Sequence, residues 1–204
     1  MQSYAILIDG GFAKRKLGSA KQHATAEDFQ QLSKRIQSSP HLSEMRLHRI
    51  YYYDSTPLAT AHQKPLSGEL VEFGEHPIAA RSRRLFDQIS QQPFTALRLG
   101  ELAFNGWEIS AKKINKANAT SLEIYSDDLR PQISQKGVDM RIGMDIAALT
   151  LKKQVQVIVL VSGDSDFVPA MKFARREGIN LFLNPLGQKV KSSMLEHSDL
   201  LLDV

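Results

Sequence analysis

Short, continuous apolar runs alternate along this chain with segments in which apolar residues recur at helical spacing. The runs predict buried strands at 4–11, 45–54, 95–104, 155–162 and 179–186. The intervening segments predict helices at 25–37, 78–89, 138–153, 167–178 and 188–197, and residues 199–204 are expected to form a terminal strand or to dock on the sheet. Apolar strands separated by helices are typical of a parallel sheet covered on both faces. We therefore expect a three-layer α/β fold with a mainly parallel central sheet.

Local signals refine this pattern at two places. Thr25 followed by Asp28 is a near-match to a capping box and predicts the start of the helix at 25–37. Asn105-Gly106, which follows the strand 95–104, predicts a tight hairpin turn. Residues 111–135 are polar, basic at their start and weakly patterned, so we expect a short helix followed by an irregular excursion.

Four aspartates fall at one predicted edge of the sheet. Asp9 ends the first strand, and Asp164 and Asp166 follow the strand 155–162. Asp139 begins the helix 138–153 after a loop, from which it can reach the same edge. In parallel sheets the carboxyl ends of the strands carry the ligand site, so we expect these four side chains to lie close together.

Clustered carboxylates of this kind suit a hard divalent cation such as Mg²⁺ or Mn²⁺, which takes a few protein oxygens and keeps several waters. Such an ion polarises a phosphoryl oxygen and lowers the pKa of a bound water. Taken alone, "SGDSDF" is explained equally well by a turn in which Asp166 caps the next helix. Asp9 and Asp139 are predicted to lie at the same edge of the sheet, and this favours a metal site over a simple turn.

Asp145 lies on the same helix face as Val138, Ile142 and Leu149. A carboxylate on an apolar face needs a partner, and Lys136 and Arg141 are the basic candidates. A structural role is favoured over a role beside the metal, although both stay open.

Composition narrows the function without deciding it. The 204 residues carry a net charge of +4, with basic clusters at 14–16, 81–84, 112–116 and 172–176, which mildly favours an anionic partner. The chain has no cysteine, so thiolate metal sites and thiol nucleophiles are excluded. It has no phosphate-binding loop, dinucleotide fingerprint or G-x-S-x-G elbow. No apolar stretch is long enough to cross a membrane, and we expect a cytoplasmic protein.

The motifs "YAILIDGGF", "QKGVDMRIGMDIAALT" and "IVLVSGDSDFVPAMKFARREG" resemble those of bacterial NYN-domain proteins. The resemblance is to the LabA-like (DUF88) group of the PIN-like nuclease superfamily, and it covers essentially the whole chain. It implies a Rossmann-like α/β/α fold. The residues predict a single domain, 1–204, with a hairpin and an irregular basic insertion at about 104–135, a region for which the resemblance offers no counterpart. The resemblance further implies RNA cleavage with Mg²⁺ or Mn²⁺ held by the four aspartates, and it matches Asp145 to a second acid of the "GVD" helix.

The sequence thus favours a metal-dependent endoribonuclease in which Asp9, Asp139, Asp164 and Asp166 are the catalytic acids. Supporting positions are Asp145, Ser162, Gly10, Lys136 and Arg141, and RNA-backbone candidates are Lys14, Arg15, Lys16, Lys112, Lys113 and Lys116. One alternative is a catalytically silent module that binds RNA or protein. Another is a Toprim-like nuclease or a phosphatase, which fits the first strand less well. Assembly as a homo-oligomer or in a protein complex is left open.

Overall fold

The computed structural model describes residues 1–19, 21–115 and 121–203. They group into two compact units. The first comprises Met1–Asp54, Leu85–Gly100 and Gly137–Val204, and the second comprises Ser55–Arg84 and Glu101–Lys136.

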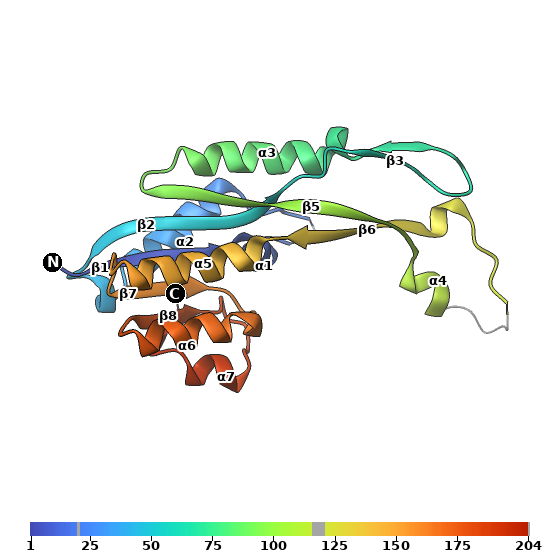
Figure 1. Ribbon diagram of the computed structural model, residues 1–204. Helices are drawn as coiled ribbons and strands as arrows, with labels where there is room; N and C mark the ends of the chain where they lie inside the picture. Colours follow the sequence, from blue (N-terminus) through green and yellow to red (C-terminus); the bar gives the residue numbers. More distant parts are fainter. Residues whose placement is uncertain (20, 116–120, 204) are drawn as a thin grey trace. The chain divides into compact units, whose positions relative to one another are not determined.

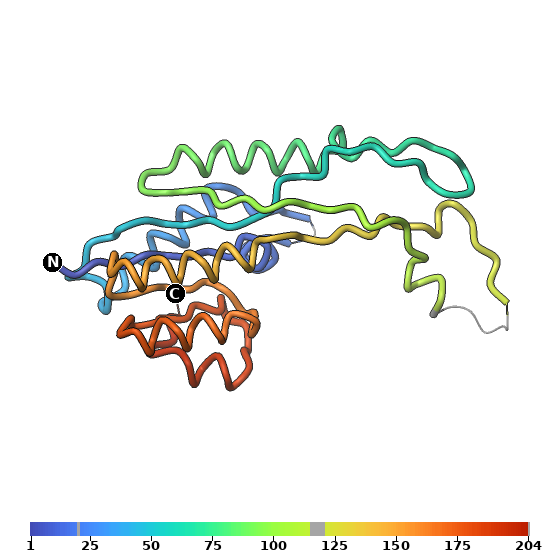
Figure 2. Tube along the Cα trace, viewed as in Figure 1, coloured from blue at the N-terminus to red at the C-terminus, as the bar shows by residue number. Residues whose placement is uncertain are grey.

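A seven-stranded, mostly parallel sheet forms the centre of a three-layer α/β fold, as the alternation of strands and helices predicts. Its strand order is β6-β5-β2-β1-β7-β8-β9. The strands are β1 (Ser3–Asp9), β2 (Arg46–Thr56), β5 (Thr95–Ile109), β6 (Leu129–Lys136), β7 (Val157–Val161), β8 (Asn180–Asn184) and β9 (Leu200–Leu201). Within the first unit, β1 pairs in parallel with β2 and with β7, although β7 lies far along the chain (Figure 2).

Alternate side chains of β1 supply the two cores of the first unit. Ile6 and Ile8 enter one core with α2 (Ala26–Gln37) and the end of α3 (Pro77–Ser90). Ala5 and Leu7 enter the other core with α5 (Val138–Leu151) and α6 (Val168–Arg176), which lie on the near face in Figure 1. These strand residues are at most 1 % exposed, and burying each large one contributes about 1.5–3 kcal/mol. The sheet edge that carries the acids is therefore built on rigid strands.

The structure confirms some of the predicted helix bounds and differs from others. The capping box of α2 is confirmed, since Thr25 Oγ1 accepts from Asp28 N at 3.3 Å and Asp28 Oδ2 accepts from Thr25 N at 2.7 Å. The helix α1 (Gly10–Leu17) was not predicted, because its glycine start and basic end hide the helical spacing. The last helix, α7 (Ser192–Glu196), is shorter than predicted. No helix in the described ranges is long and apolar enough to cross a membrane.

Short 3₁₀ segments complete the helical elements. They are η1 (Pro40–Leu42), η2 (Phe73–Glu75), η3 (Ser126–Asp128) and η4 (Ser165–Phe167).

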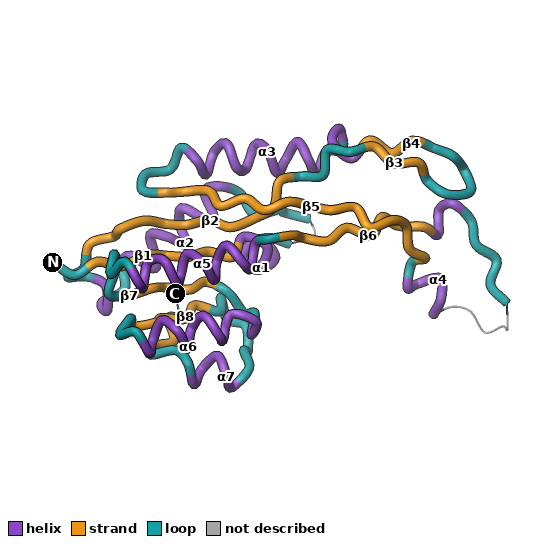
Figure 3. The backbone as a smooth tube through the Cα atoms, in the orientation of Figure 1, coloured by secondary structure: helices purple, strands orange, loops and turns teal. Residues whose placement is uncertain are grey.

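The predicted turn at Asn105-Gly106 is wrong, because β5 continues through it. The strand takes a bulge between Phe104 and Trp107, where Gly106 adopts φ +112°. Asn105 Nδ2 donates to Ser134 Oγ at 2.8 Å, which ties the bulge to β6. The antiparallel strands β5 and β6 are instead joined by the long segment 110–128, which includes α4 (Ala111–Asn115) (Figure 3). Part of the predicted irregular excursion, 116–120, lies outside the described residues.

Aromatic rings form a small core in the second unit. The ring of His62, on β3 (Ala61–Gln63), stacks on Phe104 at 3.8 Å between centroids, and Phe73 and Trp107 pack beside them. Trp107 Nε1 donates to Gln63 O at 2.9 Å. Strand β3 pairs antiparallel with β4 (Leu70–Glu72). These contacts give Trp107 the packing role that its place beside the bulge suggests.

Gly10 is where close packing at the start of α1 tolerates no side chain. A Cβ there would lie 2.5 Å from Tyr53 O and 2.6 Å from the Tyr52 ring. We expect Gly10→Ala to lower the free energy of unfolding by about 1–3 kcal/mol, because β2 would have to shift. The matched control is Gly143→Ala in α5, where the added Cβ meets nothing within 4 Å. It should raise the free energy of unfolding by about 0.5–1 kcal/mol through helix propensity. Denaturant titration measures both, and equal effects would contradict this packing account.

Candidate functional site

The carboxyl ends of β1 and β7 form one edge of the sheet in the first unit. Ile8 is in register with Val161, the last residue of β7, so Asp9 and the loop after Val161 leave the sheet side by side. Asp164 and Asp166 lie in and after that loop, around η4. Parallel pairing thus brings acids from distant parts of the chain to the same edge, as the sequence predicts.

Asp9 is held by hydrogen bonds to both of its carboxylate oxygens. Its Oδ1 accepts from Phe12 N at 3.0 Å, which caps α1, and its Oδ2 accepts from Ser162 Oγ at 3.1 Å. Burial raises the pKa of Asp9, and so does the nearby charge of Asp139, while these two hydrogen bonds and Arg15 act in the opposite direction. Ser162 is fully buried, so it fixes the direction of the Asp9 carboxylate.

The two aspartates of "SGDSD" make a local chain of backbone contacts. Ser162 Oγ also accepts from Asp164 N at 3.2 Å, and Asp164 Oδ1 accepts from Asp166 N at 3.0 Å. Asp164, rather than Asp166, is therefore the residue that caps, and it caps η4 rather than α6. Both carboxylates are exposed.

Asp139 lies in the first turn of α5, two residues after Gly137, whose φ of +76° redirects the chain into the helix. Partial burial raises the pKa of Asp139, and the charges of Asp164 and Asp166 raise it further. Because the charge of Asp139 also raises the pKa of Asp9, Asp139 is repelled by each of the other three acids.

A cation would relieve this repulsion, and the oxygen-only donor set fits Mg²⁺ or Mn²⁺. The side chains do not form a closed shell, however. In the described ranges, no group of three or more His, Asp or Glu side chains lies close enough to hold a metal ion. The donors therefore suit an ion that takes few direct protein ligands and keeps its waters.

Asp145 has partners that the sequence interpretation missed. Its Oδ2 accepts from Tyr53 Oη at 2.8 Å and from Arg98 Nε at 3.1 Å. The expected basic partners were Lys136 and Arg141, and that expectation is wrong: Arg141 Nη1 donates to Gly137 O at 3.0 Å. Burial, and then the charge of Asp145, raise the pKa of Tyr53, which stays protonated and donates. Arg98 is distant in sequence and sits in a strand, so helical spacing could not reveal it.

Asp54, which is buried, was also not recognised from the sequence. Its Oδ2 lies 2.7 Å from Lys14 Nζ and accepts from Tyr52 Oη at 2.9 Å. The charge of Asp9 contributes to the raised pKa of Tyr52, which places this group near the acidic edge. The sequence contained a signal for Asp54, because "YYYD" ends the predicted strand 45–54 with an aspartate, just as "LID" ends the first strand. Lys14, expected to contact RNA, is engaged by Asp54.

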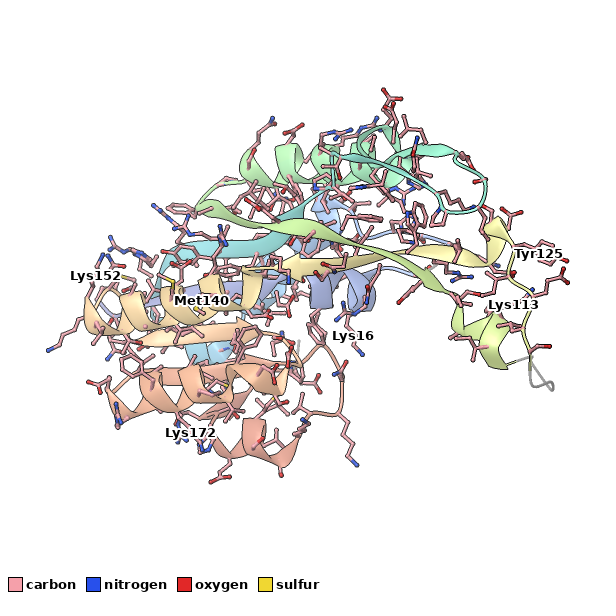
Figure 4. The ribbon with its side chains drawn as sticks, turned by 45° about the vertical axis from the view of Figure 1, so that its right-hand side comes forward. Lys16, Lys113, Tyr125, Met140, Lys152 and Lys172 are labelled. Atoms are coloured by element: carbon pink, nitrogen blue, oxygen red, sulfur yellow. The ribbon has the colours of Figure 1, made fainter. Side chains whose placement is uncertain are left out.

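The remaining basic candidates differ in their surroundings. Arg15 and Lys16 are exposed on α1, and Lys16 Nζ lies 6.0 Å from the Phe12 ring centroid. In the second unit, Lys113 Nζ lies 2.8 Å from Asp128 Oδ2 and 5.1 Å from the centroid of the Tyr125 ring, and Figure 4 labels Lys113 and Tyr125. Lys112 is exposed. Lys116 lies outside the described residues.

Comparison with known protein families decides where this arrangement belongs. The model of the NYN domain matches residues 4–199. The chain belongs to the NYN domain family. NYN domains are part of the PIN-like nuclease superfamily, so nuclease chemistry on a nucleic acid is the general activity that the family suggests.

Solved structures support the fold alone. A protein of unknown function from Vibrio parahaemolyticus is 14 % identical to this NYN domain, with a TM-score of 0.52 over 98 % of this chain and 91 % of that chain. The nicotinamidase SaPncA from Staphylococcus aureus is 14 % identical, with a TM-score of 0.33 over 97 % of this chain and 87 % of that chain. We draw no conclusion from this weak similarity. A search of the curated proteins found no significant match.

Repulsion among the acids makes the stability of the NYN domain depend on pH. The pKa of Asp139 is raised above its ordinary value of 3.8, so the folded chain binds its proton more tightly than the unfolded chain. Stability is therefore lost as the pH rises from about 3.8 through the folded pKa, and the cost is fully present at neutral pH. Without divalent ions, Asp139→Asn should raise the Tm at pH 7 by about 1–3 °C, and the gain should vanish near pH 3. Asp87→Asn, on the exposed face of α3, is the control. A gain that persists at low pH would contradict the electrostatic explanation.

The Asp145 contacts also make a stability prediction. Tyr53→Phe removes one donor to a partly buried carboxylate and should lower the free energy of unfolding by about 1–2 kcal/mol. Tyr51→Phe is the matched control, because among the described residues the Tyr51 hydroxyl has no hydrogen-bond partner. It should change the free energy by less than about 0.5 kcal/mol. Denaturant titration compares the two, and equal losses would rule out the Tyr53–Asp145 bond as the cause.

Proposed function

We propose that this NYN domain is a metal-dependent ribonuclease of the LabA-like group that hydrolyses RNA phosphodiesters endonucleolytically. Asp9, Asp139, Asp164 and Asp166 would hold Mg²⁺ or Mn²⁺, which when bound supplies charge neutralisation at the phosphate and an activated water.

The observation that carries the proposal is the contrast between acids with a basic partner and acids without one. Asp54 is paired with Lys14 and Asp145 with Arg98. The four edge acids make no ion pair within the described part of the chain. The charge of Asp139 raises the pKa of Asp9, and the charges of Asp164 and Asp166 raise the pKa of Asp139. Repelling carboxylates without a basic partner are costly unless a cation offsets them.

The chain's own groups have distinct tasks in this proposal. Ser162 and Phe12 N hold Asp9 in one direction, and Asp164 is oriented by the backbone of Asp166. Arg15 and Lys16, exposed on the helix that Asp9 caps, would attract the RNA backbone, which makes binding sensitive to salt.

One observation favours a second candidate, a catalytically silent RNA- or protein-binding module. The acids as they stand do not enclose a site in which three of them could bind one ion. Such a module would bind RNA without cutting it, and neutralising the acids would leave binding intact or strengthen it.

Asp164→Asn separates the two candidates. Asparagine retains the oxygen that accepts from Asp166 N, so the fold should be kept. We expect Mn²⁺-dependent cleavage of single-stranded or structured RNA by the unsubstituted chain and a loss of about 100-fold or more in the variant. Mn²⁺ should also raise the Tm of the unsubstituted chain and have little effect on the variant.

The control is Asp87→Asn, which makes the same change of charge away from the acidic edge. Equal cleavage rates in the three proteins would refute the assignment of Asp164. RNA binding without cleavage by the unsubstituted chain, at any Mn²⁺ concentration, would establish the silent module.

A further inference from the structure

A basic surface pocket of about 450 Å³ lies in the first unit, between the end of α6 and the start of β8. Its charged lining is Lys172, Arg175 and Arg176 from α6, with His197 and Asp199 from the segment after α7. Figure 4 labels Lys172 on α6. Asp166 precedes α6 and Arg176 ends it, so the pocket lies at the opposite end of this helix from the acidic edge, about 15 Å away at 1.5 Å per residue.

Two of the cations that line the pocket repel each other. Lys172 and Arg176 are four residues apart on α6, a spacing that puts like charges on one helix face and costs stability. Lys172 makes no ion pair with any described residue. Arg176 Nε lies 3.4 Å from Glu177 Oε1, with both side chains exposed, and its guanidinium lies 5.9 Å from the centroid of the Phe173 ring. An anion between the two cations would remove this repulsion.

A third cation, Arg175, is fixed in orientation. Its Nε donates to Asp199 Oδ1 at 2.9 Å, its Nη2 lies 2.8 Å from the same oxygen, and its Nη1 donates to Glu196 O at 2.9 Å. Asp199 is itself fixed, since its Oδ2 accepts from Leu181 N at 2.7 Å. Among the described residues, three of the five N–H donors of Arg175 are thus engaged, which leaves a rigid planar group with donors to spare.

The chemistry of the lining selects the ligand. The large apolar side chain in the lining, Ile179, is only 7 % exposed, so the pocket offers little to an apolar molecule. With His197 neutral, the lining carries three positive charges against the one of Asp199. We propose that this pocket binds a phosphate group, carried either by a nucleic acid strand or by a free phosphorylated molecule. This site is separate from the acidic edge and does not require that the edge cleave RNA.

The test compares Lys172→Gln/Arg176→Gln with a control that removes the same two kinds of charge elsewhere. That control is Lys34→Gln/Arg35→Gln on the exposed face of α2. Inorganic pyrophosphate is titrated into each protein, and amide chemical shifts are followed by NMR. We expect the shifts of Asn180 and His197 to saturate in the unsubstituted chain, and the affinity to fall at least tenfold in the pocket variant and less than twofold in the control.

A second arm identifies the source of the phosphate. Each protein also carries Asp164→Asn, and a short single-stranded RNA is titrated with and without pyrophosphate. Weaker RNA binding in the pocket variant, with competition from pyrophosphate, would identify a backbone phosphate. Pyrophosphate binding with unchanged RNA affinity would identify a free phosphorylated ligand. Both results support the pocket.

The proposal is overturned if neither pyrophosphate nor RNA shifts the pocket amides at millimolar concentration. It is also overturned if the pocket variant and the α2 control weaken binding equally. In either case the role left to Lys172 and Arg176 would be a favourable interaction with the negative, C-terminal end of the α6 dipole. Cleavage is measured in neither arm, so a silent acidic edge would leave this result unaffected.

Discussion

Parallel pairing of β1 with β7 is the contact on which the rest of the candidate site depends. It joins segments about 150 residues apart, as the Ser162–Asp9 hydrogen bond shows with its separation of 153 positions. Both strands are buried on both faces, so their register is fixed by two cores at once. A slip of one residue would exchange the cores and carry Asp9 away from Ser162.

The same register concentrates negative charge, and the chain neutralises only part of it. Asp54 and Asp145 each receive a tyrosine hydroxyl and a basic side chain, an arrangement that satisfies a buried acid and stabilises the packing of β2. Asp9 and Asp164 accept hydrogen bonds from a serine and from backbone amides, and Arg15 acts on Asp9 from a distance, but no edge acid makes an ion pair with a described residue. The edge acids, unlike Asp54 and Asp145, are close to one another without ion-pair partners. Their repulsion lowers the stability of the fold. The cation proposed above would offset this cost.

The sequence predicted what depends on periodicity and strand order, and it missed what depends on contacts across the sheet. The meeting of Asp9 with the "SGDSD" loop follows from two apolar runs that each end in acids. Arg98 could not be found in this way, because its bond to Asp145 joins a strand to a helix 47 residues away. The hairpin turn predicted at Asn105-Gly106 was wrong, because ring contacts of Phe104 and Trp107 outweigh the local turn signal and keep β5 extended through a bulge.

Helix α6 links the acidic edge to the basic pocket through its own charge distribution. Asp164 and Asp166 precede α6, and Arg175 and Arg176 lie in its last turn, so the helix dipole favours both sets of charges. The dipole explains the cations of the last turn, but it does not explain why Lys172 shares a helix face with Arg176, because the favourable field falls off within a turn while like charges repel. Lys172 lies a full turn before Arg176, where the dipole gives it least support. Its position is therefore the part of α6 that a structural role explains least and a bound phosphate explains best.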